Sequence, residues 1–318
     1  MQINIDLKDR KILYELDKNA RISCAQIGKK VGLSTEVVNY RIKKLEENKI
    51  ITQYQTEVDY NKLGLIHFKI FLRFKGIDLR TEEELYKKIE SIPQIVWIAK
   101  CRGEWDCMLS STVESISQLD EIKDNVLHLA NEYIAKKSVS ISTNIWSSPR
   151  KYLLNKRDIS QVMEGNKEPL DKIDTEILRI LSANARMPVI EIAEKLNLTI
   201  KIVSSRLKKL IDKKIIHDYR ADINFEKLGI YFFKTFFYLK NPHTERVKML
   251  INKINSHKNI IHTLKVIGDW DLDINMEFEE KKEFDKTIQE LMNEFSDIIE
   301  RITTLDIIKV YKYTFFYK

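Results

Sequence analysis

The sequence predicts an α+β protein made of two tandem copies of one unit, each a winged-type helix-turn-helix domain followed by a ferredoxin-like βαββαβ domain. Asn19-Ala20-Arg21 recurs as Asn184-Ala185-Arg186, and Gly103-Glu104-Trp105-Asp106 recurs as Gly268-Asp269-Trp270-Asp271, both 165 positions later (184−19, 268−103). Within each copy, apolar residues first follow a helical period and then alternate. A constant offset over this span indicates duplication without insertion or deletion.

These patterns divide the 318 residues into five segments. We expect helix-turn-helix domains at 1–54 and 170–219, ferredoxin-like domains at 55–148 and 220–318, and a linker at 149–169. The linker holds Ser, Asn, Lys, Gly and Pro and has a proline at each end, a composition typical of exposed connections. Its beginning, Tyr152-Leu153-Leu154, is apolar enough to pack on the first unit instead.

Three helices open each unit. In the first, Ile12, Leu13 and Leu16 share one face. The second is expected over residues 23–31 with Ser23 as its N-cap, whereas the second copy has Pro188 there, which cannot cap. The third helix is predicted over residues 35–48, and its counterpart over residues 200–213.

The period then changes from about 3.6 to 2 residues. Ile66, Phe68, Ile70, Leu72 and Phe74 alternate with more polar positions, which indicates a strand with one face in a core. We predict a helix over 82–91, strands over 95–101 and 105–113, a helix over 115–133 and a strand over 139–146. The order βαββαβ is that of a ferredoxin-like sheet with two helices on one side.

The composition favours a cytoplasmic protein with an anionic partner. The formal charge is +7 and the pI is near 9.0, a mild basic bias. Cys24, Cys101 and Cys107 are matched by apolar residues in the second copy, so buried thiols are expected, without disulfides. No apolar run approaches the roughly 18 residues that cross a bilayer.

The third helix of each unit has the position of a helix that enters the major groove of DNA. Side chains in its first turns would read base edges, and basic side chains further along would bind phosphates. The expected base-reading residues are Thr35, Glu36, Asn39, Tyr40, Lys201, Ser204 and Ser205. The expected phosphate-binding residues are Arg41, Lys43, Lys44, Arg206, Lys208 and Lys209. The competing interpretation is an ordinary solvated helix face.

Four segments of the first unit resemble the helix-turn-helix of the Lrp/AsnC family of transcription regulators. They are Asn19 to Ser23, Val31 to Ser34, Arg41 to Glu46, and Ile50-Ile51. The βαββαβ part is similar to that family's effector-binding and assembly domain. The resemblance covers nearly the whole chain, and it implies binding of double-stranded DNA and regulation by an amino acid or a similar small effector. Two non-identical copies in one chain depart from the usual symmetric dimer.

The Gly-x-Trp-Asp element admits two interpretations. The resemblance implies that Gly103, Trp105, Asp106, Gly268, Trp270 and Asp271 line an effector site. Alternatively, the glycine makes a turn, the tryptophan packs and the aspartate accepts backbone N–H bonds. In the first predicted strand of the sheet, the face opposite the core is more aromatic in unit two (Phe232, Phe236, Tyr238) than in unit one. This is expected if a partner sheet covers that face. We therefore expect a homo-oligomer through the sheet faces, with pairing within or between chains left open.

An enzyme of related fold is the alternative function. Siroheme decarboxylases share this two-part fold, and His67, His128, Arg102 and His262 would be the residues to inspect. A third possibility is an assembly protein whose helix-turn-helix no longer binds DNA. The sequence contains no recognisable phosphate loop, Cys/His metal cluster or nucleophile elbow, so no cofactor, metal or catalytic residue is expected. The differing third helices favour a built-in heterodimer that reads DNA with two unlike heads.

Overall fold

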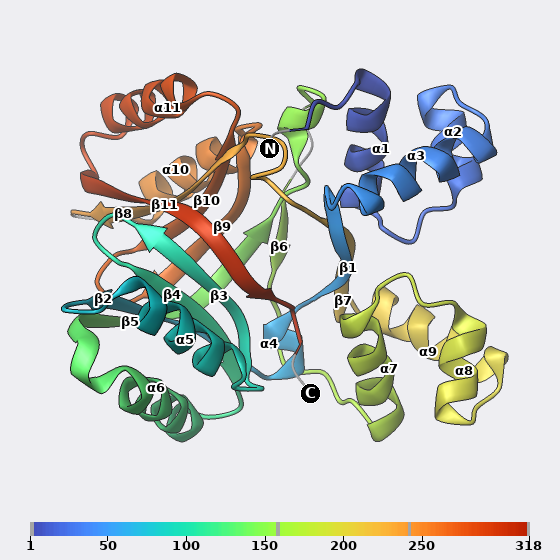
Figure 1. Ribbon diagram of the computed structural model, residues 1–318, viewed down its shortest axis with the longest axis horizontal. Helices are drawn as coiled ribbons and strands as arrows, with labels where there is room; N and C mark the ends of the chain where they lie inside the picture. Colours follow the sequence, from blue (N-terminus) through green and yellow to red (C-terminus); the bar gives the residue numbers. More distant parts are fainter. Residues whose placement is uncertain (1–2, 157–159, 241–242, 317–318) are drawn as a thin grey trace.

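The computed structural model describes residues 3–156, 160–240 and 243–316. Two three-helix domains lie at one side of the molecule and a body of strands and helices lies at the other, with two narrow strands between them (Figure 1). Among the described residues, no helix is long and apolar enough to cross a membrane.

Each helix-turn-helix domain forms as the sequence predicts. The helices of the first domain are α1 (Leu7–Lys18), α2 (Cys24–Val31) and α3 (Thr35–Glu47), and those of the second are α7 (Lys172–Ala183), α8 (Val189–Leu196) and α9 (Ile200–Asp212). Ser23 caps α2 by accepting the Gln26 N–H, whereas Pro188 before α8 makes no side-chain cap. Asn197 has φ 53°, in the left-handed region where the first domain has Gly32.

The βαββαβ order is confirmed in both copies. The first contains β2 (Ile66–Phe74), α5 (Leu79–Glu90), β3 (Ile95–Arg102), β4 (Cys107–Val113), α6 (Ile116–Ala130) and β5 (Ile134–Ser147). The second contains β8 (Tyr231–Leu239), α10 (Thr244–Ser256), β9 (Ile260–Ile267), β10 (Leu272–Phe278), α11 (Lys281–Glu294) and β11 (Ile299–Tyr313). Short elements complete the fold: α4 (Tyr60–Leu63), β6 (Gln161–Met163) and two 3₁₀ turns, Asn131–Tyr133 and Lys151–Leu153.

The last strand of each copy crosses to the other copy. The first part of β5 pairs with β2, and its end pairs with β9. In the same way, β11 pairs first with β8 and then with β3. Because β2 pairs with both β4 and β5, the strands close into a circuit, β2-β4-β3-β11-β8-β10-β9-β5, with β6 attached to β5. The two ferredoxin-like sheets thus form one body within a single chain.

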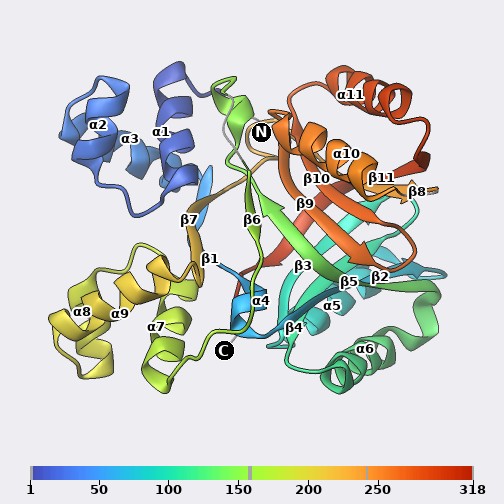
Figure 2. The ribbon, with the colours of Figure 1, turned by 180° about the vertical axis from the view of Figure 1, so that it is seen from behind.

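Helices cover the outside of this body, and the two sheets face each other inside it (Figure 2). Phe68, Ile70 and Leu72 are fully buried in the core that β2 shares with α5 and α6. On the opposite face, Phe71 meets Phe236 of the other copy, with ring centroids 5.5 Å apart. The aromatic strand face is therefore covered by the other half of the same chain. Of the two pairings left open, the structure has the one within a single chain, and further assembly between chains stays a prediction.

A two-stranded antiparallel ribbon, which the sequence pattern does not predict, joins the helical domains to the body. It consists of β1 (Ile51–Val58) and β7 (Ile216–Ile223), one strand from each copy. Both strands carry many polar residues without a clear alternation, so their period gives no signal. The ribbon is formed by residues about 165 positions apart and depends on the pairing of the two copies.

The expected exposed linker is partly wrong. Arg150, Lys151, Tyr152 and Leu153 are buried, and Tyr152 and Leu153 pack in the core of the first helical domain. The apolar start of the linker explains this packing, as the sequence suggested. The linker also supplies strand β6, which extends the sheet beside β5. Residues 157–159 of the linker lie outside the described residues.

The cysteine expectation holds for two of three thiols. Cys101 and Cys107 are buried and free, and burial raises the pKa of Cys101 to about 12. Cys24 is free but only half-buried, because it occupies the first position of α2, where one side of the helix is open.

Candidate DNA-binding face and interior cavity

The recognition helices present their predicted base-reading residues to solvent. Thr35, Glu36 and Asn39 are exposed on α3, and Tyr40 is 65% exposed, an unusual position for a large ring. On α9, Lys201, Ser204 and Ser205 are exposed. The opposite faces are buried, with Val38, Ile42 and Leu45 in the core of the first domain and Val203, Leu207 and Leu210 in that of the second.

The two arginines of the predicted phosphate-binding set are already paired. Arg41 Nη1 lies 2.8 Å from a carboxylate oxygen of Asp6 and 2.8 Å from one of Asp9, at the start of α1. Arg206 pairs in the same way with Asp171 and with Asp174, the latter at 3.2 Å. These pairs hold the third helix against the first.

The lysines predicted to bind phosphate differ in their exposure and in their ion pairs. Lys43, Lys44 and Lys208 are exposed. Lys43 lies 3.9 Å from Glu47, a weak exposed pair. Lys209 Nζ is 3.2 Å from Asp174 and is only partly exposed. The exposed lysines are therefore better placed than the arginines to meet phosphate groups.

The ribbon and the helical domains hold each other by matched hydrogen bonds. The Ala20 N–H donates to the Tyr219 carbonyl at 2.7 Å, and the Ala185 N–H donates to the Tyr54 carbonyl at 3.0 Å. Arg21 adds a contact across the domains, since its Nη1 donates to the Met187 carbonyl at 3.0 Å. Each strand of the ribbon thus positions the helical domain of the opposite copy.

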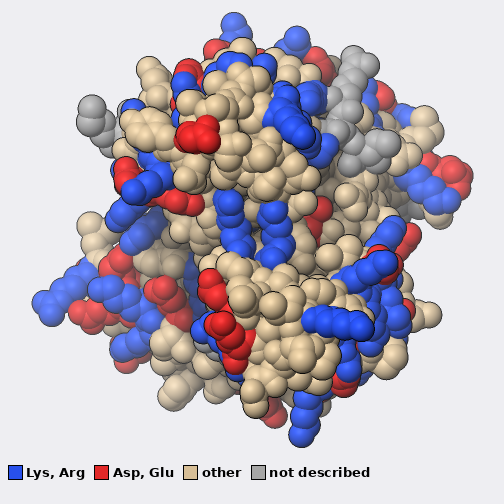
Figure 3. Space-filling model, turned by 90° about the vertical axis from the view of Figure 1, so that its right-hand side faces the viewer, with Lys and Arg blue, Asp and Glu red and all other residues tan. Residues whose placement is uncertain are grey.

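Figure 3 faces the two helical domains and shows Lys and Arg side chains over both of them and between them, with acidic groups interspersed. The second domain places Lys201, Lys208 and Lys209 on α9, and the first places Lys43 and Lys44 on α3. Such a face attracts a polyanion without forming a continuous basic patch.

The Gly-x-Trp-Asp side chains are engaged inside the body. Trp105 and Trp270 are 1% and 2% exposed, and both contact Phe71, at ring-centroid distances of 5.9 and 4.8 Å. Asp106 accepts the Phe74 backbone N–H at 2.7 Å, and Asp271 accepts the Leu239 N–H at 2.7 Å. These contacts match the structural interpretation of the element.

The first glycine of the element allows a close approach between the copies. Gly103 has φ 141°, and a Cβ there would lie 2.8 Å from Leu305 Cδ2 and 3.0 Å from the Thr304 carbonyl oxygen on β11. A side chain at this position would push apart the strands that close the circuit.

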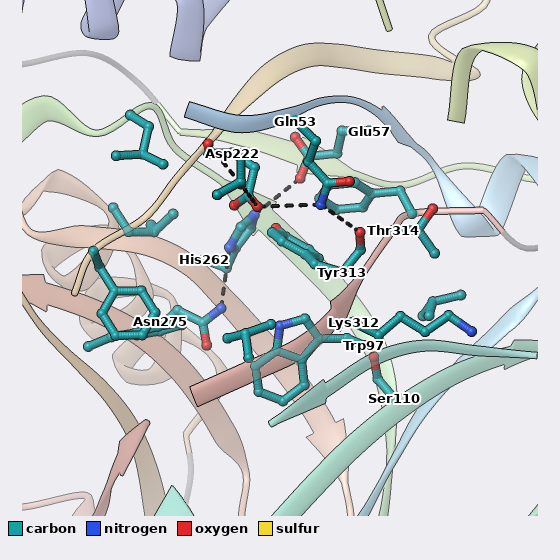
Figure 4. Close-up of a pocket in the computed structure, with 18 of the residues that line it drawn as sticks. Gln53, Glu57, Trp97, Ser110, Asp222, His262, Asn275, Lys312, Tyr313 and Thr314 are labelled. Atoms are coloured by element: carbon teal, nitrogen blue, oxygen red, sulfur yellow. Dashed lines mark hydrogen bonds and ion pairs between the residues drawn. The ribbon is translucent and has the colours of Figure 1, made fainter. Parts of the chain in front are cut away.

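A cavity of about 500 Å³ opens between the sheets and the ribbon. Aromatic walls come from Trp97, Tyr313 and Phe232, and the polar groups of Ser110, His262 and Asn275 also border it (Figure 4). Lys69, Arg150, Lys309 and Lys312 line it together with Glu57, Asp222, Glu226 and Glu277, four cations and four carboxylates. The lining thus offers both signs of charge in equal number, which suits a small ligand of mixed charge.

A buried charge cluster borders this cavity. Lys69 Nζ lies 2.7 Å from Asp273, which Lys234 also contacts, and Lys234 donates to Asn275 Oδ1 at 2.6 Å. Burial and the neighbouring Lys69 lower the pKa of Lys234 to about 7, against the opposing pull of Asp273. The sequence analysis missed these residues, although Lys69 and Lys234 occupy matched positions (234−69=165). A matched lysine on the aromatic strand face was the available signal.

The four residues named for the enzyme alternative do not all meet. His67 and His262 line the cavity, and His262 Nε2 lies 3.1 Å from Glu57. His128 is exposed on α6, and the Arg102 side chain is 74% exposed beside Asp306. Only the two histidines share the site.

Comparisons with known proteins match the helix-turn-helix domains to DNA-binding transcription regulators. The winged helix-turn-helix DNA-binding family matches residues 5–52 and 170–217, one match in each copy. The HTH-type transcriptional regulator LrpB of Bacillus subtilis is 33% identical over 139 residues, 43% of this chain and 92% of the relative. The regulatory protein AsnC of Haemophilus influenzae is 30% identical over 132 residues, 41% of this chain and 85% of the relative. The chain belongs to the Lrp/AsnC family.

A solved structure shares the arrangement of the whole chain. The siroheme decarboxylase NirDL, in complex with an iron-uroporphyrin III analogue, has a TM-score of 0.63 and covers 96% of this chain and 92% of its own. Its sequence identity is 14%, so the likeness shows a common fold alone.

Proposed function

We propose that this protein is a sequence-specific transcription regulator whose two unlike heads read two unlike half-sites. The observation that carries the proposal is the pair of recognition helices, held on one side of the molecule by the ribbon and exposing different residues. Glu36, Asn39 and Tyr40 on α3 stand where α9 has Lys201, Ser204 and Ser205. Side chains of different hydrogen-bonding capacity favour different base edges.

Base reading is assigned to the residues exposed in the first turns, and phosphate binding to the lysines. Arg41 and Arg206 act chiefly as positioning residues in this proposal, because their ion pairs with the first helix set the angle of the third helix. If their alanine variants lose DNA binding, the loss does not tell phosphate contact from positioning of the third helix. The exposed lysines therefore provide the cleaner test of phosphate contact.

The binding test compares variants of the two kinds on the same head. We expect Asn39→Ala plus Tyr40→Ala to weaken binding to the preferred site by roughly 10- to 100-fold, as losses of base contacts of about 1–3 kcal/mol require. Binding to unrelated DNA should change little. Lys43→Ala plus Lys44→Ala should weaken binding to the preferred site and to unrelated DNA alike. It should also reduce the slope of log affinity against log salt concentration by about two.

Fluorescence anisotropy with labelled duplexes over a salt series measures these effects. The matched control is Lys281→Ala plus Lys282→Ala on α11, in the ferredoxin-like body, which should leave both affinities unchanged. If the parent chain shows no salt-dependent binding to DNA, the regulator proposal fails. The alternative of an assembly protein that no longer binds DNA would then replace it.

We propose in addition that an amino-acid-like effector binds in the interior cavity, since the side chains of the two Gly-Trp-Asp turns are already engaged. Lys312 suits a carboxylate, Glu226 suits an ammonium group, and the aromatic walls suit an apolar side chain. Effector contact through those turns is then limited to their backbone atoms.

Thermal shift against single amino acids tests the effector proposal. Ser110→Leu places a larger side chain at the cavity wall and should abolish the shift, while DNA binding without effector persists. A shift that survives in Ser110→Leu would move the effector site elsewhere, and the absence of any shift across the series would remove this part of the proposal.

Siroheme decarboxylation is kept as a second candidate because His67 and His262 face one cavity between the sheets, in a fold shared with such an enzyme. Its substrate carries many carboxylates, whereas the lining balances four cations with four carboxylates. This balance favours the regulator. Titration of the purified protein with siroheme, followed by absorption spectroscopy, distinguishes the two, and no binding removes the enzyme candidate.

A further inference from the structure

The ribbon that holds the two heads has a bulge near each end. Thr52 is the extra residue at one end, between the pairs Ile51↔Ile223 and Gln53↔Asp222. His217 is the extra residue at the other end, between Glu57↔Asp218 and Val58↔Ile216. The two ends correspond through the duplication, because 52+165=217. A bulge re-aims a side chain, so each end gathers groups that a regular ladder would separate.

At the first end, neutral donors satisfy one carboxylate. Thr52 Oγ1 donates to Asp222 Oδ2 at 2.6 Å, and Gln53 Nε2 lies 3.4 Å from the same oxygen. Figure 4 shows Gln53 and Asp222 side by side, joined by this contact. The arrangement needs no further ligand.

At the second end, each of these groups has been replaced. His217 stands for Thr52, Asp218 for Gln53 and Glu57 for Asp222 (218−53 and 222−57 both equal 165). One nitrogen or oxygen atom from each of the three residues lies within 4.8 Å of the others. Two carboxylates therefore face each other across the ladder, an arrangement that destabilises a sheet unless a cation lies between them.

The hydrogen bonds at this end leave part of the cluster unsatisfied. Glu57 accepts from Ser147 Oγ at 2.9 Å and meets His262 Nε2 at 3.1 Å. His217 Nε2 is buried and has no hydrogen-bond partner among the residues that the structure describes. Buried ring nitrogens without a partner are rare, and this imidazole offers a ring nitrogen within 4.8 Å of both carboxylates, as a metal ligand does.

Among the residues that the structure describes, no Lys or Arg side chain forms an ion pair with Glu57 or Asp218. Arg220 lies close, but its Nη2 is 2.9 Å from both oxygens of Asp17, which is fully buried.

We propose that Glu57, His217 and Asp218 bind one divalent transition-metal ion at the base of the ribbon. One imidazole and two carboxylates are a donor set that suits Zn²⁺ and its neighbours better than Mg²⁺ or Ca²⁺, which take oxygen ligands. Ser147 and His262 act as outer partners that orient the Glu57 carboxylate.

Metal occupancy links the two strands that carry the heads. Glu57 is on β1, which follows recognition helix α3, and His217 and Asp218 are on β7, which follows α9. A bound ion therefore fixes the register of the ribbon at one of its two ends. At the other end, the side-chain hydrogen bonds of Thr52 and Gln53 to Asp222 link the two strands.

The test is isothermal titration of the full chain, without an affinity tag, with Zn²⁺ and separately with Mg²⁺, and absorption spectroscopy with Co²⁺. We expect one Zn²⁺ per chain and d–d bands with Co²⁺. The decisive variant is His217→Thr plus Asp218→Gln, which copies the other end of the ribbon. It should fold, because that end already accommodates these residues, and should lose more than about 100-fold in Zn²⁺ affinity, since even outer partners contribute about 10- to 100-fold.

Asp218→Asn is a second variant of nearly the same shape, and His128→Thr removes an exposed histidine elsewhere as the control. Equal Zn²⁺ affinity in the parent chain and the two site variants overturns the proposal, as does a parent chain that binds no Zn²⁺. Equal binding of Mg²⁺ overturns the assignment to a transition metal. These readings involve no DNA, so they stand independently of the proposed regulator function.

Discussion

Replacement of Asp17 by asparagine is expected to destabilise the folded protein by about 3–5 kcal/mol, the usual effect of removing one partner from a buried ion pair. Asp17 is 1% exposed and accepts hydrogen bonds from the Arg150 backbone N–H at 2.6 Å and from Arg150 Nη1 at 2.7 Å. Arg220 Nη2 contacts both of its oxygens. The variant leaves two buried guanidinium groups short of a negative partner.

This network joins the first helical domain to the ribbon and the body. Asp17 lies on α1, Arg220 on the ribbon and Arg150 at the start of the linker. Arg150 also pairs with Glu277 on β10, and its Nε lies 2.9 Å from Glu277 Oε2. Chemical denaturation monitored by circular dichroism measures the loss, with Asp120→Asn, an exposed carboxylate beside Lys123, as the control. A loss below about 1 kcal/mol, typical of surface pairs, would contradict the account.

The same network predicts how stability depends on pH. Although burial opposes it, the charges of Arg220 and Arg150 hold the pKa of Asp17 below its usual value of 3.8. A carboxyl group whose pKa is lower in the folded than in the unfolded state stabilises the fold fully above its unfolded-state pKa. This contribution is lost as the pH falls through its folded-state pKa. The difference in unfolding free energy between parent and Asp17→Asn should therefore be constant above about pH 5 and shrink below about pH 4.

Replacement of Trp270 by alanine should cost about 3–5 kcal/mol, the range for truncating a large buried aromatic ring. Its ring lies 4.1 Å from Phe236 and 4.8 Å from Phe71 between centroids, so the variant leaves a void where the two sheets meet. Thermal unfolding followed by near-ultraviolet circular dichroism records both the stability and the packing of this aromatic cluster.

The companion variant Trp270→Phe separates the two interpretations of the Gly-Trp-Asp element. The indole Nε1 is buried without a hydrogen-bond partner among the described residues, so phenylalanine should keep most of the stability. If the ring serves packing alone, any thermal shift caused by an effector should persist in Trp270→Phe. Loss of that shift with unchanged stability would assign the ring to the effector site.

Local structure was predictable because it depends on neighbouring residues. Ser23 marks a helix start through its own side-chain chemistry, and Pro188 makes no side-chain cap, both as predicted. The alternation of Phe68, Ile70 and Leu72 correctly indicated which strand face lies under the helices. The duplication itself predicted that both halves share one fold.

The remaining features depend on contacts between the halves, which no local pattern records. The ribbon pairs Glu57 with Asp218 across about 160 residues, and the cavity collects Trp97, Ser110 and Asn275 from different strands. Arg41 and Arg206 looked like exposed basic residues because their acidic partners lie 32 and 35 positions earlier. Comparison of matched positions was the one sequence signal that reached such distances, as Lys69 and Lys234 show.

Selection of bound sequences from random DNA, combined with the mass of the resulting complex, tests most directly whether one chain is a built-in heterodimer. The account predicts that a single chain protects two adjacent half-sites of unlike sequence, spaced by about one helical turn of DNA or a multiple of it. The variant Asn39→Ser plus Tyr40→Ser, which copies Ser204 and Ser205 of the other head, should make the two half-sites more alike. A perfectly palindromic preferred site in the parent chain, with two chains bound to it, would contradict the account.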